Sequence, residues 1–562
     1  MPAGAWLTGL AFAVVAVPFI WAMVRLAISP ADHLTLPDDL ALIDLHVRRA
    51  QVWKQQLGVF DHNNWNHPGP TYFYLLSLAY RVLGSSARSL FVGATLLNAL
   101  SAVACVAVVR RRTTPTRALW AAVWVAVLAG VLAAGGTAAT TYSESVLGAL
   151  VSPWNPMVVL FPLLLMVLLC AGAIDRSAPS LVGALLVGSF VIQTDISTTP
   201  LALALVGVAG LVWLVTVVLD SRSRVGQPSD APAVGTAIQG RWSAGLVGGG
   251  LVALALMWLP PVVQQFTNHP GNLTLIEQFF RAGHPSQTLS ASMWSVAAAV
   301  AVLVVGPSEV MGSILGGAPA HAGLAVAVSL ATVLLASAVT VVGARQRSRF
   351  AIGTGVLTLV GIVASVAAVT HVVGFIFGYL VVWAVVLPVA TLIGAGTVRI
   401  ALPTSSSGPE AQVTGVRVVL AAVAAVVVIV TCTRVAAIPS LDHASDPHVG
   451  QLAALAVPRL APGQRIAVGD AGAGTVDTRL LDTEEFIGLV DLLDRSGYRP
   501  TVNDFWKAQF GPGFRTDGTE PRVVGLSTWT PRSPELRGYV GHVGDMAVTV
   551  TDRSGGAVPA AG

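Results

Sequence analysis

Charged residues are scarce in this chain of 562 residues, of which only 11% are Asp, Glu, Lys or Arg. A soluble globular domain is normally about one quarter charged, so the composition excludes an ordinary soluble protein. Hydrophobic residues make up 54% of the chain, and the mean hydropathy is +0.73. We therefore expect an integral membrane protein. The formal net charge of +4 gives no indication of a nucleic-acid partner.

Cysteine is equally rare. Cys105, Cys170 and Cys432 all lie in apolar segments, which excludes a disulfide framework or a cysteine-based metal cluster. The spacing of the histidines and aspartates matches no metal-binding motif either. We accordingly predict no metal site and no cofactor, although a divalent cation held by carboxylates is compatible with the sequence.

What the chain has in abundance is long apolar runs, which can cross about 30 Å of hydrocarbon as helices. They lie near 4–28, 87–109, 118–136, 155–174, 178–194, 199–219, 243–262, 320–343, 350–370, 372–396 and 414–434. The first run is too long for the core of a signal peptide and precedes no small-residue cleavage site, so we expect a retained helix.

A further run at 293–306 is ambiguous, and counting it would give twelve spans instead of about eleven. Cytoplasmic loops carry an excess of arginine, and with a cytoplasmic N-terminus the eleven-span arrangement places Arg110–Arg112, Arg176, Arg345 and Arg347 inside. We therefore interpret 293–306 as a half-buried or interfacial helix that ends at Gly306-Pro307.

An odd number of spans places residues 435–562 outside the cell membrane, and this tail holds 15 of the 28 acidic residues. Its pattern predicts helices at 447–459 and Thr483–Arg495 and strands at Arg465–Gly469, Val523–Ser527 and Met546–Val550. The predicted fold is thus an all-α polytopic membrane protein with a small C-terminal α/β extracytoplasmic domain containing a βαβ unit. We divide it into 1–434, with a first outer loop at 29–86, and 435–562.

Polar residues collect in the segments expected outside, at 29–86, 137–154, 195–198 and 263–319. Such groups are costly at a membrane face, and their gathering on one side indicates a functional site. The carboxylates of Asp38, Asp39 and Asp44 are the most informative. A carboxylate near the lipid boundary loses solvation and becomes a better proton acceptor.

Asp38 and Asp39 have a second interpretation, because acids are favoured in the first turn of a helix. An amphipathic segment, 45–57, follows them and is typical of a helix at the membrane surface. We favour the capping role for Asp38 and a chemical role for Asp39.

The stretch DHNNWNHPGP at 61–70 directly precedes an aromatic apolar run. Pro68 and Pro70 fit the beginning of a helix, which would place Asn66 and His67 at its N-terminus, where unpaired N–H groups attract an anion. The alternative is a proline-started helix with an aromatic belt at the membrane interface, including Trp65 and Tyr72.

These residues resemble the GT-C superfamily of polytopic glycosyltransferases, and in particular its protein O-mannosyltransferase-like branch, over roughly residues 1–400. The branch has first-loop acidic residues and an HPP-like motif, which here reads His67-Pro68-Gly69-Pro70 with the second proline displaced. Further segments are similar to actinobacterial members of the superfamily: Asp39–Leu42, Ser152–Pro156, Gln193–Asp195, Trp258–Pro261 and Pro270–Asn272.

The resemblance implies inverting transfer of a sugar from a polyprenyl-phosphate carrier to an acceptor on the outer face of the cell membrane. It assigns the general base to Asp39 and the second acidic position to Asp44. An Asp–Glu doublet would be commoner in the family, and this departure leaves the base open among Asp38, Asp39 and Asp44. The implied partners are the lipid-linked donor, membrane lipid, and a cell-envelope glycan, lipid or protein acceptor.

The remaining predicted substrate-binding residues are of three kinds. Arg48, Arg49, Lys54, His67 and Arg281 could bind the donor phosphate. Trp65, Tyr72 and Trp154 could stack on sugar rings. The polar residues Asp38, Asn66, Asn155, Gln193, Asp195, Gln264, His269 and Asn272 complete the set, although an acid such as Asp195 at the end of a span more often serves as a cap.

Two other function classes compete with this interpretation. A transporter or flippase for lipid-linked saccharides would normally show inverted repeats and ionisable groups at mid-membrane, and the sequence shows neither. A membrane-anchored glycan-binding protein would need only the tail, so eleven spans and a polar first loop would be unexplained.

Overall fold

The computed structural model describes the whole chain except residues 1–2, 31–33, 135–146, 225–233, 312, 400–408, 471–483, 505 and 560–562. The chain forms two compact units. Unit 1 comprises Met1–Ala27, Ala94–Val263 and Phe280–Ile438, and unit 2 comprises Ile28–Gly93, Gln264–Phe279 and Pro439–Gly562. Unit 2 thus joins the expected first outer loop to the C-terminal tail. The division at 434/435 stays a prediction.

Within the described part of the chain, nine helices are long and apolar enough to cross a membrane. They are α1 (Ala3–Ile28), α4 (Arg88–Arg112), α5 (Pro115–Ala133), the pair α6–α7 (Asn155–Val158 and Leu160–Ile174), η2–α9 (Ile196–Thr198 and Thr199–Arg224), α10 (Val234–Thr267), α15 (Ala322–Arg345), α16 (Arg349–Val369) and α18 (Pro409–Ala436). Each coincides with a predicted span, so the prediction of a multi-pass helical membrane protein is confirmed.

Two of the eleven expected spans are shorter than the others. Helix α8 (Ala178–Thr194) has 17 residues. The apolar run at 372–396 becomes β4 (Ile376–Phe377), paired with β3 (Ile314–Leu315), then η3 (Gly378–Leu380), η4 (Val382–Val385) and α17 (Val386–Ala395). A Cβ at Gly378 would lie 1.7 Å from the carbonyl oxygen of Val310, so close chain packing overrides the apolar pattern there.

The ambiguous segment forms α12 (Leu289–Val300) and the short α13 (Val302–Val305). It ends at Gly306, whose φ of 93° is accessible mainly to glycine, and Pro307 follows. Helix α14 (Ser308–Met311) is a single turn beyond it. The break therefore lies where the sequence predicts it.

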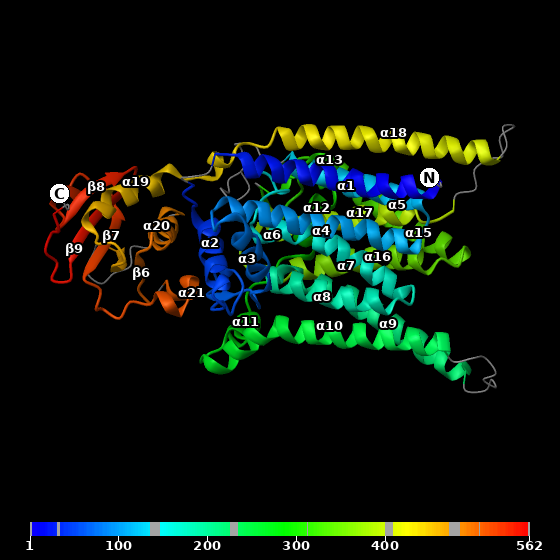
Figure 1. Cartoon of the computed structure of the whole chain (residues 1–562), viewed down its shortest axis with the longest axis horizontal. Helices are drawn as coiled ribbons and strands as arrows, with labels where there is room; N and C mark the ends of the chain where they lie inside the picture. The colour runs from blue at the N-terminus through cyan, green and yellow to red at the C-terminus, as the bar shows by residue number, and fades with distance from the viewer. Residues whose placement is uncertain are drawn as a thin grey trace. The chain divides into compact units, whose positions relative to one another are not determined.

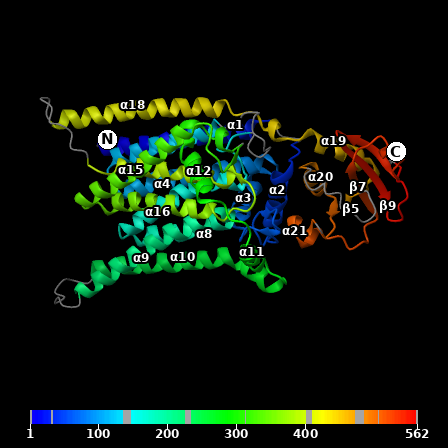
Figure 2. The ribbon, with the colours of Figure 1, turned by 180° about the vertical axis from the view of Figure 1, so that it is seen from behind.

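Helix α7 forms the centre of unit 1, because 94% of its apolar window is buried. It packs against α8, α9 and α16, and Figures 1 and 2 show the long helices of this unit running alongside one another. Small residues allow close approach: a Cβ at Gly172 would meet the Ser180 hydroxyl oxygen at 2.6 Å, and one at Gly353 would meet Ala171 at 3.1 Å. Such contacts are typical of helices packed in lipid.

Unit 2 contains a five-stranded sheet in the order β6-β5-β7-β9-β8. The strands are β5 (Arg465–Asp470), β6 (Arg499–Thr501), β7 (Arg522–Thr528), β8 (Tyr539–Val543) and β9 (Met546–Asp552). Strand β5 is parallel to β6 and β7, whereas β9 is antiparallel to β7 and β8. A βαβ unit is present as expected, formed by β5, α20 (Glu484–Arg495) and β6, although the sequence predicted β7 as the next strand after the helix. Helix α19 (Pro447–Ala456) packs on β8 and β9.

The first-loop residues of unit 2 form helices too. Helix α2 (Asp38–Gln51) is followed by the hairpin of β1 (Phe60–Asp61) and β2 (Trp65–Asn66) and by α3 (Thr71–Leu83). Helix α11 (Asn272–Arg281) and the short α21 (Lys507–Phe510) come from the other two segments. Strands β6 and β8, and α21, were not anticipated from the sequence because each is short.

A network of buried ion pairs joins α2 to α20. Arg48 lies 2.9 Å from Asp44, 2.7 Å from Asp491 and 3.0 Å from Asp494, and Arg495 also pairs with Asp44. Asp44 has no exposed surface. Burial, together with the neighbouring charge of Asp44, raises the pKa of Asp491 despite Arg48. The two helices therefore depend on each other for neutralising their charges.

We expect Arg48→Met to lower the unfolding free energy of unit 2 by about 3–5 kcal/mol, because it removes the ion pair of the buried Asp491 and leaves Asp44 with Arg495 alone. Hydrogen–deuterium exchange of the full chain should increase in both α2 and α20. Arg515→Gln is the matched control, since the side chains of Arg515 and Asp504 are 54% and 67% exposed and such a pair contributes about 1 kcal/mol or less. Equal effects of the two variants would contradict a structural role for the network.

Candidate functional site

Helix α2 begins with the two aspartates expected to carry chemistry. Asp38 and Asp39 are half-buried and lie in its first turn, where Pro37 occupies the N-cap position without a capping side chain. Asp38 has a φ of 38°, which aspartate adopts more readily than most residues. The helix dipole favours negative charge at this end. The helix expected from residue 45 therefore starts seven residues earlier, with the aspartates inside it.

Asp44 has different surroundings from Asp39, since five residues along a helix turn the side chain by about 140°. Asp44 and Arg48 are both committed to the ion-pair network with α20. Arg48 already has three carboxylate neighbours, which leaves it little capacity for a phosphate. A catalytic role for Asp44 and a donor-binding role for Arg48 stay predictions, and the geometry favours a structural role for both.

The stretch DHNNWNHPGP forms most of the β1–β2 hairpin and the irregular segment that leads to α3. The His67 N–H donates to the carbonyl of Val59 at 2.7 Å, and the carbonyl of His67 accepts from Gly58 at 3.0 Å. Helix α3 begins only at Thr71, with Pro70 at its N-cap. The placement of Asn66 and His67 at a helix N-terminus was therefore wrong, because Pro68, Gly69 and Pro70 separate them from the first residue of the helix.

Asn66, Gln264 and Asn272 come together although they are far apart in the sequence. The Asn66 N–H donates to Asn272 Oδ1 at 2.8 Å, and Asn272 Nδ2 donates to the Asn66 carbonyl at 2.7 Å. The Asn272 N–H donates to Gln264 Oε1 at 3.0 Å. All three side chains are buried. These bonds fasten the hairpin to the start of α11.

A cavity of about 460 Å³ lies within unit 2 beside the hydrogen bonds among Asn66, Gln264 and Asn272. Its lining residues from the first loop are His46, Arg49, Lys54, Gln55, Gln56, Leu57, Asn64 and Asn66. Those from the other segments are Gln264, Asn268, His269, Pro270, Asn272, Leu275, Asp504, Ala508, Gln509, Phe510, Gly511 and Pro512. The structure thus gathers five predicted substrate-binding residues, Arg49, Asn66, Gln264, His269 and Asn272, and Lys54 as well.

Arg49 differs from Arg48 in that it has no ion pair among the described residues. Its guanidinium lies over the ring of Phe514 at 5.7 Å, and its Nε has no hydrogen-bond partner within that part of the chain. Burial lowers the pKa of Arg49, and Asp494 compensates only in part. The cavity wall therefore carries a desolvated cation without a matching carboxylate, an arrangement that favours an anionic group of a ligand.

His46 lines the same cavity as a neutral base. Burial, and secondly the charge of Arg49, lowers the pKa of His46 to about 3. Its Nε2 is 3.1 Å from the carbonyl oxygen of Gln509, and its ring meets Phe73 edge-on at 5.1 Å. Among the described residues Nδ1 has no partner, and neither has Gln509 Oε1. Two buried polar atoms are thus available for a hydroxyl-rich ligand.

The sequence reasoning missed His46 and Gln509. His46 lies three residues before Arg49, so helical spacing alone places both on one face of α2. No comparable signal exists for Gln509, because its approach to α2 depends on the fold of the tail. The predicted residue Tyr72 is buried, Trp65 packs against Phe279 with ring centroids 5.8 Å apart, and His269 is exposed.

The other predicted residues belong to unit 1 and form a separate group. Asn155 Nδ2 donates to the carbonyl of Thr194 at 3.3 Å, and Gln193 Nε2 donates to that of Met257 at 3.1 Å. Trp154 contacts Tyr379, with ring centroids 4.8 Å apart. Asp195 accepts from the Ser197 N–H at 3.0 Å, so the capping interpretation of this acid is confirmed. Arg281 is exposed at the end of α11.

The folded protein keeps His46 neutral, so its contribution to stability should depend on pH. An unfolded histidine takes up a proton near pH 6.5, whereas the folded pKa is about 3. Its stabilising contribution is therefore complete above pH 6.5 and declines as the pH falls, by about 2 kcal/mol at pH 5. Glutamine does not titrate. We therefore expect the free energy of unfolding of His46→Gln, measured by thermal unfolding, to fall less between pH 7 and pH 5 than that of the wild type.

Other groups also titrate in this range, and the raised pKa of Asp491 acts in the opposite direction. The relevant quantity is therefore the difference between wild type and His46→Gln at each pH. A difference that does not change between pH 7 and pH 5 would show that His46 is not kept neutral.

Comparison with known proteins gives structural matches only: no protein-family model and no curated protein matches the sequence. The crystal structure of ArnT from Cupriavidus metallidurans bound to undecaprenyl phosphate matches over 97% of this chain and 98% of its own, with 13% identity and a TM-score of 0.52. This similarity shows that the chain shares the fold of that structure, and it confirms the predicted fold class of a polytopic helical membrane protein.

Two further structures match with lower scores. The crystal structure of the Archaeoglobus fulgidus oligosaccharyltransferase in complex with zinc and sulfate covers 91% of this chain and 67% of its own, with 11% identity and a TM-score of 0.40. The cryo-EM structure of the arabinofuranosyltransferase AftD from Mycobacteria covers 84% of this chain and 30% of its own, with 17% identity and a TM-score of 0.33.

Proposed function

We propose that this protein transfers a sugar from a polyprenyl-phosphate carrier to an acceptor on the outer face of the cell membrane, with inversion at the anomeric carbon. The observation that carries the proposal is the only partly compensated cation Arg49 in a polar cavity, on the same helix that begins with Asp38 and Asp39. The fold shared with ArnT, whose structure holds undecaprenyl phosphate, supports a lipid-linked donor.

In the proposed reaction Asp39 accepts the proton of an acceptor hydroxyl. The hydroxyl oxygen attacks the anomeric carbon of the donor while the bond from that carbon to the phosphate oxygen breaks. The polyprenyl phosphate leaves with the bonding electron pair, and the proton remains on Asp39. A single displacement inverts the configuration at the anomeric carbon. In this proposal the N-terminus of the chain is cytoplasmic, and unit 2 faces the outside of the cell membrane.

Arg49 and Asp39 would act on different parts of the substrates. Ten residues of helix separate them, which is about 15 Å along the axis, whereas reacting groups must approach within about 3.5 Å. We therefore assign the cavity to the acceptor. Its amide side chains suit hydroxyl groups, and Arg49 suits a phosphate or carboxylate, so the acceptor would be an anionic cell-envelope glycan. Lys54 lines the same cavity and therefore goes with the acceptor in this proposal, whereas His67 remains a proposed partner of the donor phosphate.

Asp39→Asn keeps the shape of the side chain but cannot accept a proton. We expect sugar transfer in proteoliposomes from labelled polyprenyl-phosphate sugars to fall by about 100-fold or more, with donor binding retained. Asp38→Asn is the matched control in the same helical turn and should keep most of the activity. A larger loss in Asp38→Asn would move the base to Asp38.

Arg49→Gln should raise the KM for an anionic acceptor by about tenfold or more and leave kcat nearly unchanged, because the removed interaction binds ground state and transition state alike. Arg81→Gln is the control, since Arg81 is a first-loop cation on α3 that bonds the Gln51 carbonyl and does not line the cavity. A loss confined to kcat would contradict the assignment of the cavity to the acceptor.

The two alternative functions give different results in the same preparation. A flippase would move lipid-linked saccharide across the proteoliposome membrane without forming a new glycosidic bond. A glycan-binding protein would show neither process, yet would bind the acceptor through the cavity.

A further inference from the structure

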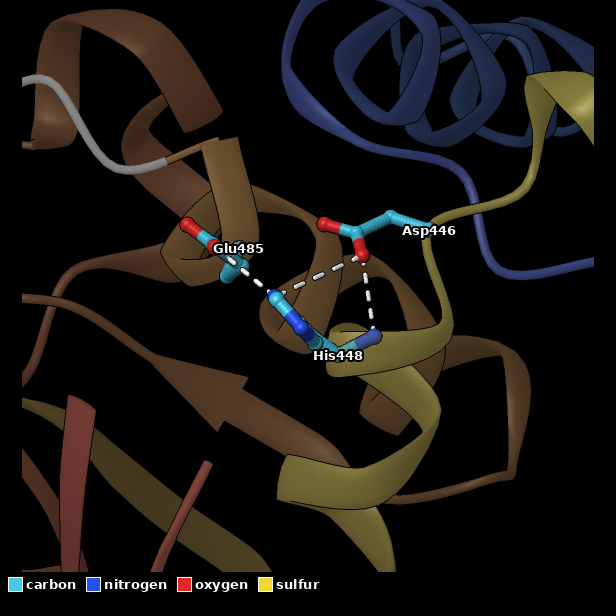
Figure 3. Close-up of side chains that lie close together, drawn as sticks. All are labelled: Asp446, His448 and Glu485. Atoms are coloured by element: carbon cyan, nitrogen blue, oxygen red, sulfur yellow. Dashed lines mark hydrogen bonds and ion pairs between the residues drawn. The ribbon is translucent and has the colours of Figure 1, made fainter. Parts of the chain in front are cut away.

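Three potential metal ligands converge in unit 2, outside the cavity described above (Figure 3). Asp446 is the N-cap residue of α19, and His448 lies in the first turn of that helix. Glu485 lies in the first turn of α20. Their ligand atoms, one imidazole nitrogen and two carboxylate oxygens, all lie within 4.8 Å of one another.

The distances suit a shared cation better than direct hydrogen bonds. His448 Nδ1 lies 3.5 Å from Glu485 Oε1 and 4.0 Å from Asp446 Oδ1, both longer than an ordinary hydrogen bond to nitrogen. Two ligands bound to one zinc ion at about 2.0–2.2 Å lie about 3.3–3.6 Å apart in a tetrahedral site. Small side-chain rotations would bring all three atoms into that range.

The charges also point to a cation. Among the described residues, neither Asp446 nor Glu485 pairs with an arginine or lysine, and the only ion-pair contact of each is with His448. Two carboxylates and one imidazole therefore share one location without a fixed positive charge to offset them.

We propose that Asp446, His448 and Glu485 bind one divalent transition-metal ion, with zinc the ion that fits this ligand set best. Zinc accepts a mixture of imidazole and carboxylate ligands, whereas magnesium and calcium prefer oxygen alone. The 48% exposure of the His448 side chain allows water to complete the coordination.

The ion would have a structural consequence for the first loop. It would hold the N-terminal ends of α19 and α20 together, and the chain that leads into α2 is fastened at the same point. The Asp446 N–H donates to the Thr35 carbonyl at 2.8 Å, and the Thr35 N–H donates to Ser445 Oγ at 3.0 Å. Since Thr35 lies three residues before Asp38, the ion would stabilise the segment that positions both first-turn aspartates.

The direct test is binding of zinc to the purified full-length chain in detergent after treatment with a chelator. Isothermal titration should find one high-affinity Zn²⁺ per chain, and X-ray absorption at the zinc edge should show nitrogen and oxygen ligands with one imidazole. His448→Gln and Glu485→Gln should each weaken binding by at least about tenfold. Zinc should raise the apparent melting temperature of the wild type and not of His448→Gln.

His443→Gln is the matched control, because His443 is an exposed histidine five residues away and does not belong to the cluster. It should bind zinc as the wild type does. Unchanged affinity in His448→Gln, or an absorption spectrum of the wild type without an imidazole ligand, would overturn the proposal. So would the absence of a high-affinity site. Because the spectrum needs only the wild type, and no readout involves sugar transfer, the test is independent of the proposed activity.

Discussion

The buried ion pairs between α2 and α20 are the interaction on which the rest of unit 2 depends. Arg48 bridges Asp44 on its own helix and Asp491 and Asp494 on α20, and Arg495 returns the contact to Asp44. Breaking such a group leaves charges in a poorly solvated interior, which costs far more than the loss of a surface pair. The network fixes the rotation of α2 about its axis. As a result, the Arg48 side chain pairs with α20, whereas the Arg49 side chain lines the cavity.

The same constraint explains why the candidate cavity is built from three distant segments. Helix α2 supplies His46 and Arg49, the hairpin and the start of α11 are fastened by the Asn66–Asn272 bonds, and the residues around α21 supply Gln509 and Phe510. None of these segments could enclose a polar cavity alone. The C-terminal tail is thus part of the candidate site, which gives it a role beyond that of an appended domain.

Unit 2 also shows how one tail helix serves several purposes. Helix α20 carries the acids that pair with Arg48, and its first turn supplies Glu485 to the proposed metal site. Gly488 lies between these positions, and a Cβ there would lie 2.6 Å from the Leu36 carbonyl oxygen. The close passage of the chain before α2 across α20 requires a glycine. The entry to α2, its side chains and the proposed cation are therefore all held by the same twelve-residue helix.

The sequence by itself determined the properties that depend on local pattern: the membrane class, the positions of the long helices, the break at Gly306-Pro307 and the βαβ unit of the tail. Hydrophobic runs and helix-breaking residues act over short distances, so these follow from the order of residues. The sequence also placed Arg49, Asn66, Gln264, His269 and Asn272 among a larger set of candidate binding residues, and the structure brings these five together at one cavity. Only the tertiary structure decided which charges pair. Arg48 and Arg49 are adjacent and chemically identical, yet they have different roles. Asp491 and Asp494, more than 400 positions later in the chain, form ion pairs with Arg48. Arg49 has only the partial counter-charge of Asp494. Coulomb and hydrogen-bond energies depend on distance in space, which no local pattern specifies.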